Sequence, residues 1–318
     1  MKALVTGGAG FIGQHLCRRL IAEANDVVVF DALTRAATGK QLLLDAGIPI
    51  VTGGVEMPES VFSTLAFHKP DIVFHLAAES HVDASLVDPK SAILTNAVGT
   101  QVVASACTKF DIPLVYCSTD EVYGDLYGTR WAAGGAKEGE TPLRPSSPYS
   151  AGKAGGEFVV HAMARSFGLR AMITRGSNAY GPGQLSEKLV PIVSACATDD
   201  RPVPVHGDGE QIRQWIHVAE FAEALSLAGK RALTLPHGQT ETWNIAGPER
   251  MSVNEVVRLF GAVAEHGPDR PGQDRLYAIS GEKMAAVGFM PIQRLAYHAD
   301  FLKRHYMNYE IEATAWAE

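Results

Sequence analysis

Short apolar runs and amphipathic stretches alternate along the first part of the chain. The apolar runs are rich in β-branched and aromatic residues and have the length of buried strands; they fall at residues 2–6, 27–30, 48–52, 71–76 and 113–117. Helix-like stretches separate them at residues 11–24, 59–67 and 89–109. Strands and helices that alternate in this way predict a parallel sheet covered by helices on both faces, the doubly wound α/β class.

A glycine-rich turn joins the first strand to the first helix. It reads Gly7-Gly8-Ala9-Gly10-Phe11-Ile12-Gly13, a spacing that lets backbone N–H groups approach a pyrophosphate at a helix N-terminus. Asp31 ends the second strand, where a carboxylate accepts hydrogen bonds from the ribose hydroxyls of NAD and repels the 2′-phosphate of NADP. Arg35 is the one nearby residue that favours NADP instead. Strand, glycines, helix and acid in this order predict an NAD site.

The pattern changes character in the second half of the chain. A helix over 149–167 and a strand over 170–174 continue the alternation, which weakens beyond Gly183. We therefore predict a Rossmann-type domain over residues 1–182 and a smaller, interleaved substrate-binding lobe mainly over 183–318. Segments near 213–230 and 242–246 could return to the first domain. The Gly- and Pro-rich stretch 125–147 is either a flap that covers the substrate or a plain surface insertion.

Two adjacent acids follow the apolar run at 113–117. The sequence continues Ser118-Thr119-Asp120-Glu121, and ligands of open α/β sheets bind outside the carboxyl ends of the strands. Two neighbouring carboxyls that are partly desolvated cannot both ionise easily. They would then divide into an acid and a base, as elimination chemistry requires. The alternative is a solvated turn, where such side chains bond locally.

Tyr149 and Lys153 are four residues apart and share one face of a predicted helix. A tyrosine with a pKa near ~10 is a poor base at neutral pH. A nearby ammonium group favours its phenolate, as does the positive ring of an oxidised nicotinamide. The glycines of this helix, Gly152, Gly155 and Gly156, each cost roughly 1 kcal/mol in a helix interior. They predict that another element packs closely against that face.

Composition excludes several classes of partner. The 318 residues carry a net charge of −7 and no run of Lys or Arg, so nucleic acid and anionic membranes are not expected partners. The four cysteines are far apart and the histidines lack ligand spacing, so neither a disulfide framework nor a metal site is expected. No apolar run reaches the length of a membrane span, and glycines interrupt the N-terminus too early for a signal peptide. We expect a cytoplasmic protein.

Taken together, these residues resemble the extended short-chain dehydrogenase/reductase superfamily, in particular the nucleotide-sugar 4,6-dehydratases typified by dTDP-glucose 4,6-dehydratase. The resemblance runs from TGGAGFIG at 6–13 to RPGQDRLYAI at 270–279. The glycine motif and the Tyr149–Lys153 spacing mark the superfamily, whereas Thr119-Asp120-Glu121 marks the dehydratases, because related epimerases and decarboxylases typically lack the acid pair. Further similar segments are HLAAESHVD (75–83), SNAYGP (177–182), EKLVP (187–191) and GDGEQIRQW (207–215).

The resemblance implies which residues hold each ligand. The catalytic set is Thr119, Asp120, Glu121, Tyr149 and Lys153. The residues expected at NAD are Gly7, Gly10, Phe11, Ile12, Gly13, Asp31, Ala32, Leu33, Thr34, Leu76, Ala77, Ala78, Thr95, Tyr149 and Lys153. Those expected at the sugar nucleotide are Ser80, Thr119, Asn178, Glu187, Lys188, Arg213, Asn244 and Arg270. Among the last group the basic residues suit a diphosphate, which Arg can bind in a bidentate manner.

The resemblance also implies a reaction. A hexose carried on a nucleotide diphosphate, most simply dTDP-glucose, would be oxidised at C4, lose water across C5 and C6, and regain hydride at C6, which makes the protein an NAD-dependent lyase. Tyr149 would take the C4 hydroxyl proton, Glu121 the C5 proton, and Asp120 would protonate the departing hydroxyl. The alternatives are an epimerase or decarboxylase of the same superfamily and, more distantly, a non-catalytic NAD-binding protein. Helices 89–109 and 149–167 are expected to form a homodimer contact.

Overall fold

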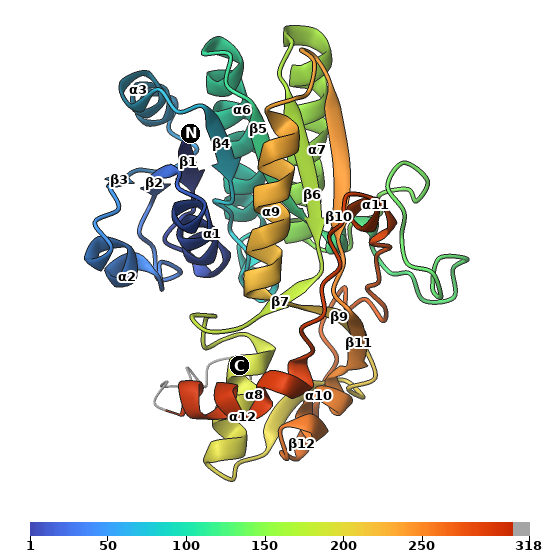
Figure 1. Cartoon of the computed structure of the whole chain (residues 1–318). Helices are drawn as coiled ribbons and strands as arrows, with labels where there is room; N and C mark the ends of the chain where they lie inside the picture. The colour runs from blue at the N-terminus through green and yellow to red at the C-terminus, as the bar shows by residue number, and fades with distance from the viewer. Residues whose placement is uncertain (308–318) are drawn as a thin grey trace.

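A parallel sheet forms the centre of the computed structural model, which describes residues 1–307. Its seven strands lie in the order β10-β6-β5-β4-β1-β2-β3 (Figure 1). Their bounds are β1 (Lys2–Thr6), β2 (Asp26–Asp31), β3 (Ile50–Thr52), β4 (Ile72–His75), β5 (Leu114–Thr119), β6 (Ala171–Gly176) and β10 (Thr240–Ile245). The predicted fold class, a doubly wound parallel α/β sheet, is confirmed.

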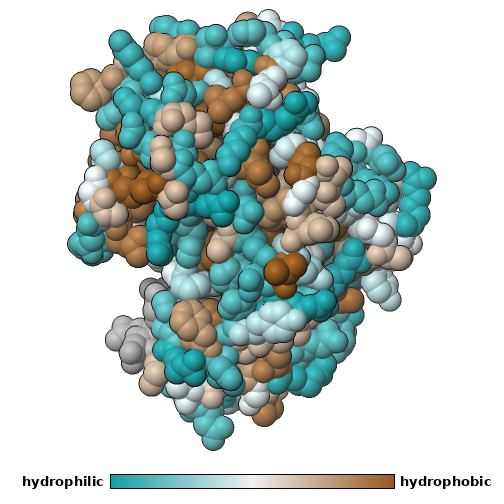
Figure 2. All heavy atoms as spheres, viewed as in Figure 1, coloured by the Kyte–Doolittle hydropathy of each residue, from teal (hydrophilic) through white to brown (hydrophobic). Residues whose placement is uncertain are grey.

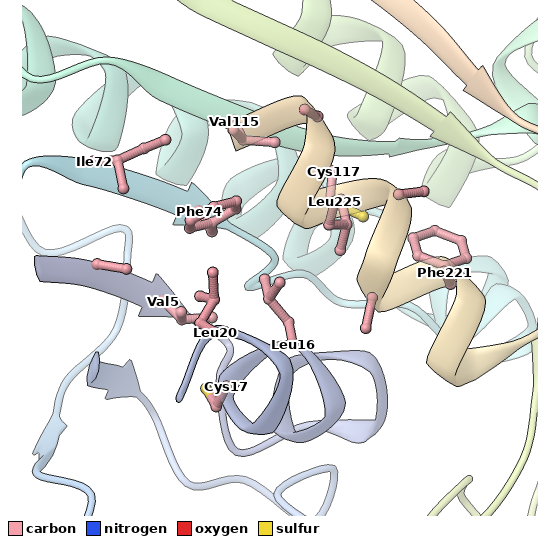
Figure 3. Close-up of a cluster of buried hydrophobic side chains, with 14 of the residues drawn as sticks. Val5, Leu16, Cys17, Leu20, Ile72, Phe74, Val115, Cys117, Phe221 and Leu225 are labelled. Atoms are coloured by element: carbon pink, nitrogen blue, oxygen red, sulfur yellow. The ribbon is translucent and has the colours of Figure 1, made fainter. Parts of the chain in front are cut away.

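Helices cover both faces of this sheet, because successive strand residues point to opposite sides and both sides are apolar. On one face Val5, Phe74 and Val115 pack against Leu16 of α1 and Leu225 of α9 (Figure 3). A second apolar cluster on the other face joins the strands to α3, α6 and α7. These helices are α1 (Phe11–Ala22), α3 (Pro58–His68), α6 (Thr100–Lys109), α7 (Pro148–Phe167) and α9 (Val218–Ala232).

The direction of strand order reverses between β1 and β4, which are neighbours in the sheet although β2 and β3 lie between them in sequence. This topological switch point is where open α/β sheets bind ligands, outside the carboxyl ends of the strands. The loops after β1 and β4 meet there: a side chain at Gly7 would place its Cβ only 2.5 Å from the backbone nitrogen of Ala77. The fold therefore brings the glycine turn and the loop after β4 to one crevice.

A smaller lobe lies below the sheet in Figure 1 and has an apolar core of its own, which includes Tyr180, Trp215 and Phe260. The chain returns from it to the large sheet, because α9 covers one face and β10 pairs with β6. The domain boundary near residue 183 stays a prediction, and residues 308–318 lie outside the described residues. The lobe contains β7 (Asn178–Tyr180), β8 (Val203–His206), β9 (Ile212–His217), β11 (Glu249–Ser252), β12 (Ala264–Gly267), α8 (Leu189–Thr198), α10 (Val253–Leu259) and α12 (Leu295–Tyr306).

The predicted helix over 89–109 is helical throughout but is not a single α-helix. It consists of α5 (Pro89–Ile93), a π-helical segment η1 (Leu94–Gly99) and α6. Shorter helices complete the described part of the chain, namely α2 (Lys40–Asp45), α4 (Val82–Val87) and α11 (Glu282–Ala286). No helix within residues 1–307 is long and apolar enough to cross a membrane.

The stretch 125–147 projects beyond β10 and α11 in Figure 1, yet it is anchored at several points. The backbone N–H groups of Leu126 and Ala136 donate to the carbonyls of Leu276 and Ala278, at 3.1 and 2.9 Å. Arg250 holds the middle of the loop by donating to the carbonyls of Ala132 and Ala133. These contacts fix the loop to the segment that follows residue 275 and to β11.

A buried ion pair connects the sheet to helix α7. Arg175 of β6 donates from Nε and Nη2 to the Glu157 carboxylate, with an Nη2–Oε2 distance of 2.6 Å, and both side chains are almost fully buried. Its third nitrogen donates to the Tyr123 hydroxyl at 2.7 Å, and that hydroxyl donates to Oδ1 of Asn244 at 2.9 Å. Four elements thus meet in one hydrogen-bonded network. Hydrophilic side chains cover much of the outer face in Figure 2, where water can solvate them. The Glu157–Arg175 pair is buried, so its charges must be satisfied by partners inside the protein.

We expect Glu157→Gln and Arg175→Met, each tested singly, to lower the free energy of unfolding by roughly 3–5 kcal/mol, because each leaves its charged partner buried and unpaired. Urea denaturation followed by circular dichroism would measure this. The exposed pair between Asp199 and Arg201 is a matched control, since Asp199→Asn should cost less than about 1 kcal/mol. Wild-type stability in both buried variants would show that the pair is dispensable.

Candidate active site

The glycine turn after β1 is shaped for close approach of a ligand. Gly7 has a φ of +69°, and a Cβ on Gly13 would lie 2.2 Å from the carbonyl oxygen of Gly7, so side chains are excluded at both positions. Helix α1 begins at Phe11 with Gly10 as its N-cap and without a capping side chain. An uncapped helix start beside side-chain-free backbone is a site for a phosphate group.

Asp31 fixes the second part of this crevice. Its carboxylate is buried and accepts backbone hydrogen bonds from Ala9 at 3.0 Å and from Leu33 at 2.8 Å. The carboxylate thereby holds the glycine turn beside the loop after β2, where Ala32 and Thr34 are exposed. A fixed carboxylate next to a phosphate site suits the ribose of NAD, so the residues present fit this cofactor.

The loop after β4 and the π-helical segment form the facing wall. Leu76 and Ala77 donate backbone hydrogen bonds to Thr6 of β1, and both residues and Ala78 are partly exposed. Asn96 of η1 accepts from the backbone nitrogen of Glu79 and donates to its carbonyl, each at 2.9 Å. Asn96 holds the loop in place, a role that the sequence analysis did not predict. Thr95, expected at the cofactor, precedes it and is partly exposed.

The acid pair begins a 3-10 helical turn, η2 (Asp120–Tyr123), directly after β5. The Thr119 hydroxyl lies 3.3 Å from Oδ1 of Asp120 and accepts from the backbone nitrogen of Glu121 at 3.3 Å. Asp120 is 4% exposed and Glu121 is partly exposed. The pair is therefore part of a buried wall and is not the solvated turn that the sequence left open.

Burial makes the two carboxyls unequal. It raises the pKa of Asp120 to about 8, the negative charge of Glu121 adds to this, and Arg213 opposes it. Burial also raises the pKa of Glu121, but Arg213, Arg270 and Lys188 all act to lower it. Neutral pH therefore favours a protonated Asp120, while three cations oppose the effect of burial on Glu121. The division of the pair into an acid and a base stays a prediction.

Tyr149 lies in the first turn of α7, which begins with a capping box formed by Ser147 and Ser150. Its backbone nitrogen donates to the hydroxyl of Ser85 at 3.2 Å. Burial and the charge of Glu121 raise the pKa of Tyr149 well above its ordinary value, while a hydrogen bond with Thr119 opposes the rise. Desolvation is the largest of these effects, and the expectation that Lys153 favours the phenolate stays a prediction.

Lys153 is buried one helical turn further on, with its ammonium 4.8 Å from the centre of the Tyr116 ring. The predicted close packing of the glycines on this helix is confirmed. A Cβ on Gly156 would lie 2.3 Å from the Tyr116 hydroxyl, and one on Gly152 would lie 3.0 Å from Cβ of Asn96. The glycines let α7 approach β5 and η1, which places Tyr149 beside the end of β5.

Three basic residues of the small lobe converge on the acid pair. Arg213 is buried with its guanidinium 4.2 Å from the centre of the Tyr277 ring. Lys188 donates to the backbone carbonyl of Ser80 at 3.0 Å, and Arg270 pairs with Asp83 at 3.0 Å. All three act on the charge of Glu121, and their binding of a diphosphate stays a prediction.

Several buried polar atoms in this region have no hydrogen-bond partner among residues 1–307. They include Oδ2 of Asp120, Oδ1 of Asn178 and Nε of Arg270. Asn178 lies two residues beyond Gly176, which pairs with Thr119 across the sheet. Because buried polar groups normally have partners, these atoms mark a site for a polar ligand. Over the same described residues, no group of three or more His, Cys, Asp or Glu is placed to hold a metal ion.

Two of the expected substrate residues have other partners. Asn244 is fully buried, accepts from Tyr123 and donates to the carbonyls of Ala136 and Ser280 at 2.9 and 3.2 Å. Its oxygen and its amide nitrogen are therefore engaged within the protein, and a contact of Asn244 with the substrate stays a prediction. Glu187 forms an ion pair with Arg35 of the loop after β2.

Asp274 and Tyr277 line the acid pair but were missed by the sequence reasoning. The Tyr277 hydroxyl donates to Asp274 at 2.7 Å, and the charge of Asp274 raises the pKa of Glu121. Both lie in the RPGQDRLYAI segment at 270–279. Their closeness in sequence to Arg270, an expected substrate residue, is the signal that could have indicated them.

The sheet, the glycine crevice and the Tyr149–Lys153 helix define an NAD-dependent enzyme of the extended short-chain dehydrogenase/reductase type. The profile of the NAD-dependent epimerase/dehydratase family matches residues 3–246. The chain belongs to this family.

Within this family, the chain is similar to curated proteins named dTDP-glucose 4,6-dehydratase. The chain is 36% identical to the dTDP-glucose 4,6-dehydratase of Streptomyces niveus, covering 92% of this chain and 88% of the relative. It is 37% identical to dTDP-glucose 4,6-dehydratase 1 of Escherichia coli K12, with the same coverage.

Solved structures share the whole fold. The dTDP-glucose 4,6-dehydratase DesIV of Streptomyces venezuelae, solved with NAD bound, has a TM-score of 0.86 at 33% identity and covers 96% of this chain and 97% of its own. The UDP-glucose 4-epimerase of Thermus thermophilus, also with NAD, has a TM-score of 0.86 at 29% identity, covering 98% of this chain and 100% of its own. Overall shape therefore does not separate dehydratases from epimerases, and the side chains at the site must.

Proposed function

We propose that this protein is an NAD-dependent hydro-lyase that converts a nucleotide-diphosphate hexose, most simply dTDP-glucose, to its 4-keto-6-deoxy product. The observation that carries the proposal is the buried Asp120–Glu121 pair, whose carboxyls differ in their tendency to ionise and lie beside Tyr149. The curated relatives named dTDP-glucose 4,6-dehydratase support the same substrate.

The order of steps follows from the acidity of the sugar. The C5 hydrogen of a hexose is not acidic until C4 is a ketone, so oxidation must precede the loss of water. When bound, NAD supplies the chemistry that takes hydride from C4 and returns it at C6. Tyr149 accepts the proton of the C4 hydroxyl. Thr119, which hydrogen-bonds with Tyr149, orients the same C4 hydroxyl. Because burial raises the pKa of Tyr149, positive charge is needed to favour its phenolate, and Lys153 is the cation on its own helix face.

The acid pair carries out the elimination. Glu121 removes the C5 proton, and Arg213, Arg270 and Lys188 favour its ionised form against the effect of burial. Asp120 is protonated at neutral pH and donates its proton to the departing C6 hydroxyl, which leaves as water. Hydride at C6 and a proton at C5 then complete the product, which differs from the substrate by one water without net oxidation.

An epimerase is the second candidate, because the Thermus epimerase shares the fold as fully as the dehydratase does. Epimerisation requires only oxidation and reduction at C4. It leaves no role for the two adjacent acids Asp120 and Glu121, so the dehydratase accounts for more of the site. A non-catalytic NAD-binding protein would leave all five catalytic positions unexplained.

Substitutions of the two acids should separate these functions. Asp120→Asn cannot protonate the leaving hydroxyl, so dehydration should slow by roughly 10²–10⁴-fold, the usual range for general-acid catalysis. In heavy water this variant should still exchange the C5 hydrogen of recovered substrate. Glu121→Gln should abolish that exchange, because no base remains at C5. Mass spectrometry of substrate and product measures both effects. Both variants dehydrating at the wild-type rate would favour the epimerase.

The pH dependence should report Asp120. A carboxyl whose pKa is raised to about 8 keeps its proton below that pH, so kcat/KM should be maintained at neutral pH and fall as the pH rises through about 8. On the acid side kcat/KM should fall as Glu121 becomes protonated, at a pH above its ordinary pKa. The alkaline limb should disappear in Asp120→Asn. If Asp120→Asn keeps the same alkaline limb as the wild-type protein, a group other than Asp120 is responsible for that limb.

We also propose a homodimer located in the cytoplasm. Ile93, Leu94 and Val98 are 40–42% exposed on the helix formed by α5 and η1, and Phe158 is 61% exposed on the adjoining α7. Exposed apolar side chains on neighbouring helices mark an interface, and a two-fold contact is the commonest oligomeric arrangement. Four unpaired, buried cysteines suit a reducing compartment.

Sedimentation velocity at micromolar concentration should show a dimer that Val98→Glu combined with Phe158→Glu converts to monomer. The charges would be buried without partners in the interface. Phe67→Glu is the matched control, since Phe67 is 81% exposed on α3 and lies outside the proposed contact. A monomeric wild-type protein would contradict the proposal.

A further inference from the structure

The first turn of α7 has backbone N–H groups that need partners outside the helix ladder. Pro148 has no N–H group, and the N–H of Ser150 donates to the hydroxyl of Ser147 at 3.1 Å. The N–H of Tyr149 donates instead to the hydroxyl of Ser85, at 3.2 Å. The residue proposed to take the proton of the sugar is therefore joined through its own backbone to a side chain of another element, helix α4.

Ser85 is suited to hold that N–H group in one place. Its side chain is only 1% exposed, and its hydroxyl donates to the carbonyl of Val82 at 2.6 Å. Because this bond fixes the direction of the hydroxyl proton, the lone pairs of the same oxygen are left to accept from Tyr149. The hydroxyl thus connects the backbone of α4 to the backbone of α7.

Helix α4, which carries Ser85, is itself held by two cations of the small lobe. Asp83, in its first turn, pairs with Arg270 at 3.0 Å. Lys188 donates to the carbonyl of Ser80 at 3.0 Å, just before the helix begins. Both cations are among the residues expected at the sugar nucleotide. The short helix therefore contacts the small lobe on one side and the helix that carries the tyrosine on the other.

The other anchors of α7 act further along the helix. Glu157, which pairs with β6, follows Tyr149 by roughly two turns. Gly152 and Gly156 approach η1 and β5 after the first turn has ended. The capping box is internal to the first turn. The hydrogen bond with Ser85 therefore adds a tie to another element at the residue where the catalytic ring leaves the backbone.

We propose that Ser85 is a positioning residue for Tyr149, which holds the phenol hydroxyl against the C4 hydroxyl of the sugar by fixing the first turn of α7 to α4. The assignment rests on the proposed function, in which Tyr149 takes the C4 proton. Proton transfer requires the two oxygens to lie within hydrogen-bond reach, and a displacement of about 1 Å can cost about 10²-fold in rate. Loss of the Ser85 hydroxyl should therefore slow C4 oxidation without weakening the binding of the sugar nucleotide.

The kinetic test isolates the oxidation step in the NAD-loaded Glu121→Gln protein, the parent, in which the reaction should stop after C4 is oxidised. Stopped-flow absorbance of the reduced nicotinamide, recorded over a range of dTDP-glucose concentrations, gives the maximal rate and the half-saturating concentration. We expect Ser85→Ala in this background to lower the maximal rate by roughly 10- to 100-fold, with the half-saturating concentration changed less than about 2-fold.

A second readout needs no substrate. The hydrogen bond with Ser85 protects the N–H of Tyr149 from exchange with solvent, so exchange of this amide should be at least about 10-fold faster in Ser85→Ala than in the parent. Hydrogen–deuterium exchange resolved to single amides by NMR measures it. The amide of Glu157, two turns further on, should exchange at the parent rate.

Two sets of variants separate the hydroxyl from other effects of the substitution. Ser85→Thr and Ser85→Val introduce side chains of nearly the same shape, of which only threonine carries a hydroxyl. Ser85→Thr should therefore oxidise the substrate at least about 5-fold faster than Ser85→Val. Ser194→Ala is the control for a lost buried hydroxyl, since Ser194 of α8 is fully buried and donates to the carbonyl of Val190 at 2.7 Å. It should keep the parent rate.

Several outcomes would overturn the assignment: a parent maximal rate or an unchanged Tyr149 exchange in Ser85→Ala, a change confined to the half-saturating concentration, equal rates in Ser85→Thr and Ser85→Val, or an equal loss in Ser194→Ala. A parent protein that shows no reduced nicotinamide with dTDP-glucose would instead refute the proposed function, so the two failures can be told apart. Thermal melts verify that each variant is folded.

Discussion

The buried ion pair between Glu157 and Arg175 holds the catalytic elements in one frame. Arg175 belongs to the sheet and Glu157 to the helix that carries Tyr149, so the pair fixes the distance between them. Its extension through Tyr123 reaches the end of the turn that begins with Asp120. Charges buried in this way tolerate little displacement, because each depends on the geometry of the other. The acid pair and the tyrosine are therefore positioned by one rigid connection and not by separate loops.

This frame also explains why neighbouring carboxyls can have different roles. Asp120 points into the buried side of the turn, where one oxygen has no partner among the described residues. Glu121 faces the cations of the small lobe. Burial raises the pKa of both acids, and the cations of the small lobe oppose it, one at Asp120 and three at Glu121. In the proposed reaction the lobe therefore contributes electrostatics as well as binding surface.

Features governed by local chemistry could be predicted from the sequence. The glycine turn, Asp31 after β2 and the acid pair after β5 depend on a strand end and a few adjacent residues. Features governed by tertiary contacts could not. Asn244 has the residue type of a ligand contact, but Tyr123 and two carbonyls distant in sequence engage it. The effect of burial on the pKa of Tyr149 could not be predicted for the same reason, since desolvation depends on everything that packs around the ring.

The π-helical segment η1 has a consequence for where this helix can change its length. A π-helical turn holds more residues than an α-helical turn, so η1 takes up an extra residue between α5 and α6 without turning either of them. Deleting one residue within Leu94–Gly99 would close this turn into a regular helix, and the contact of Asn96 with Glu79 is the one at risk. One residue added to or removed from α6 itself would turn every later side chain by about 100° around the axis and carry its buried side chains away from the sheet.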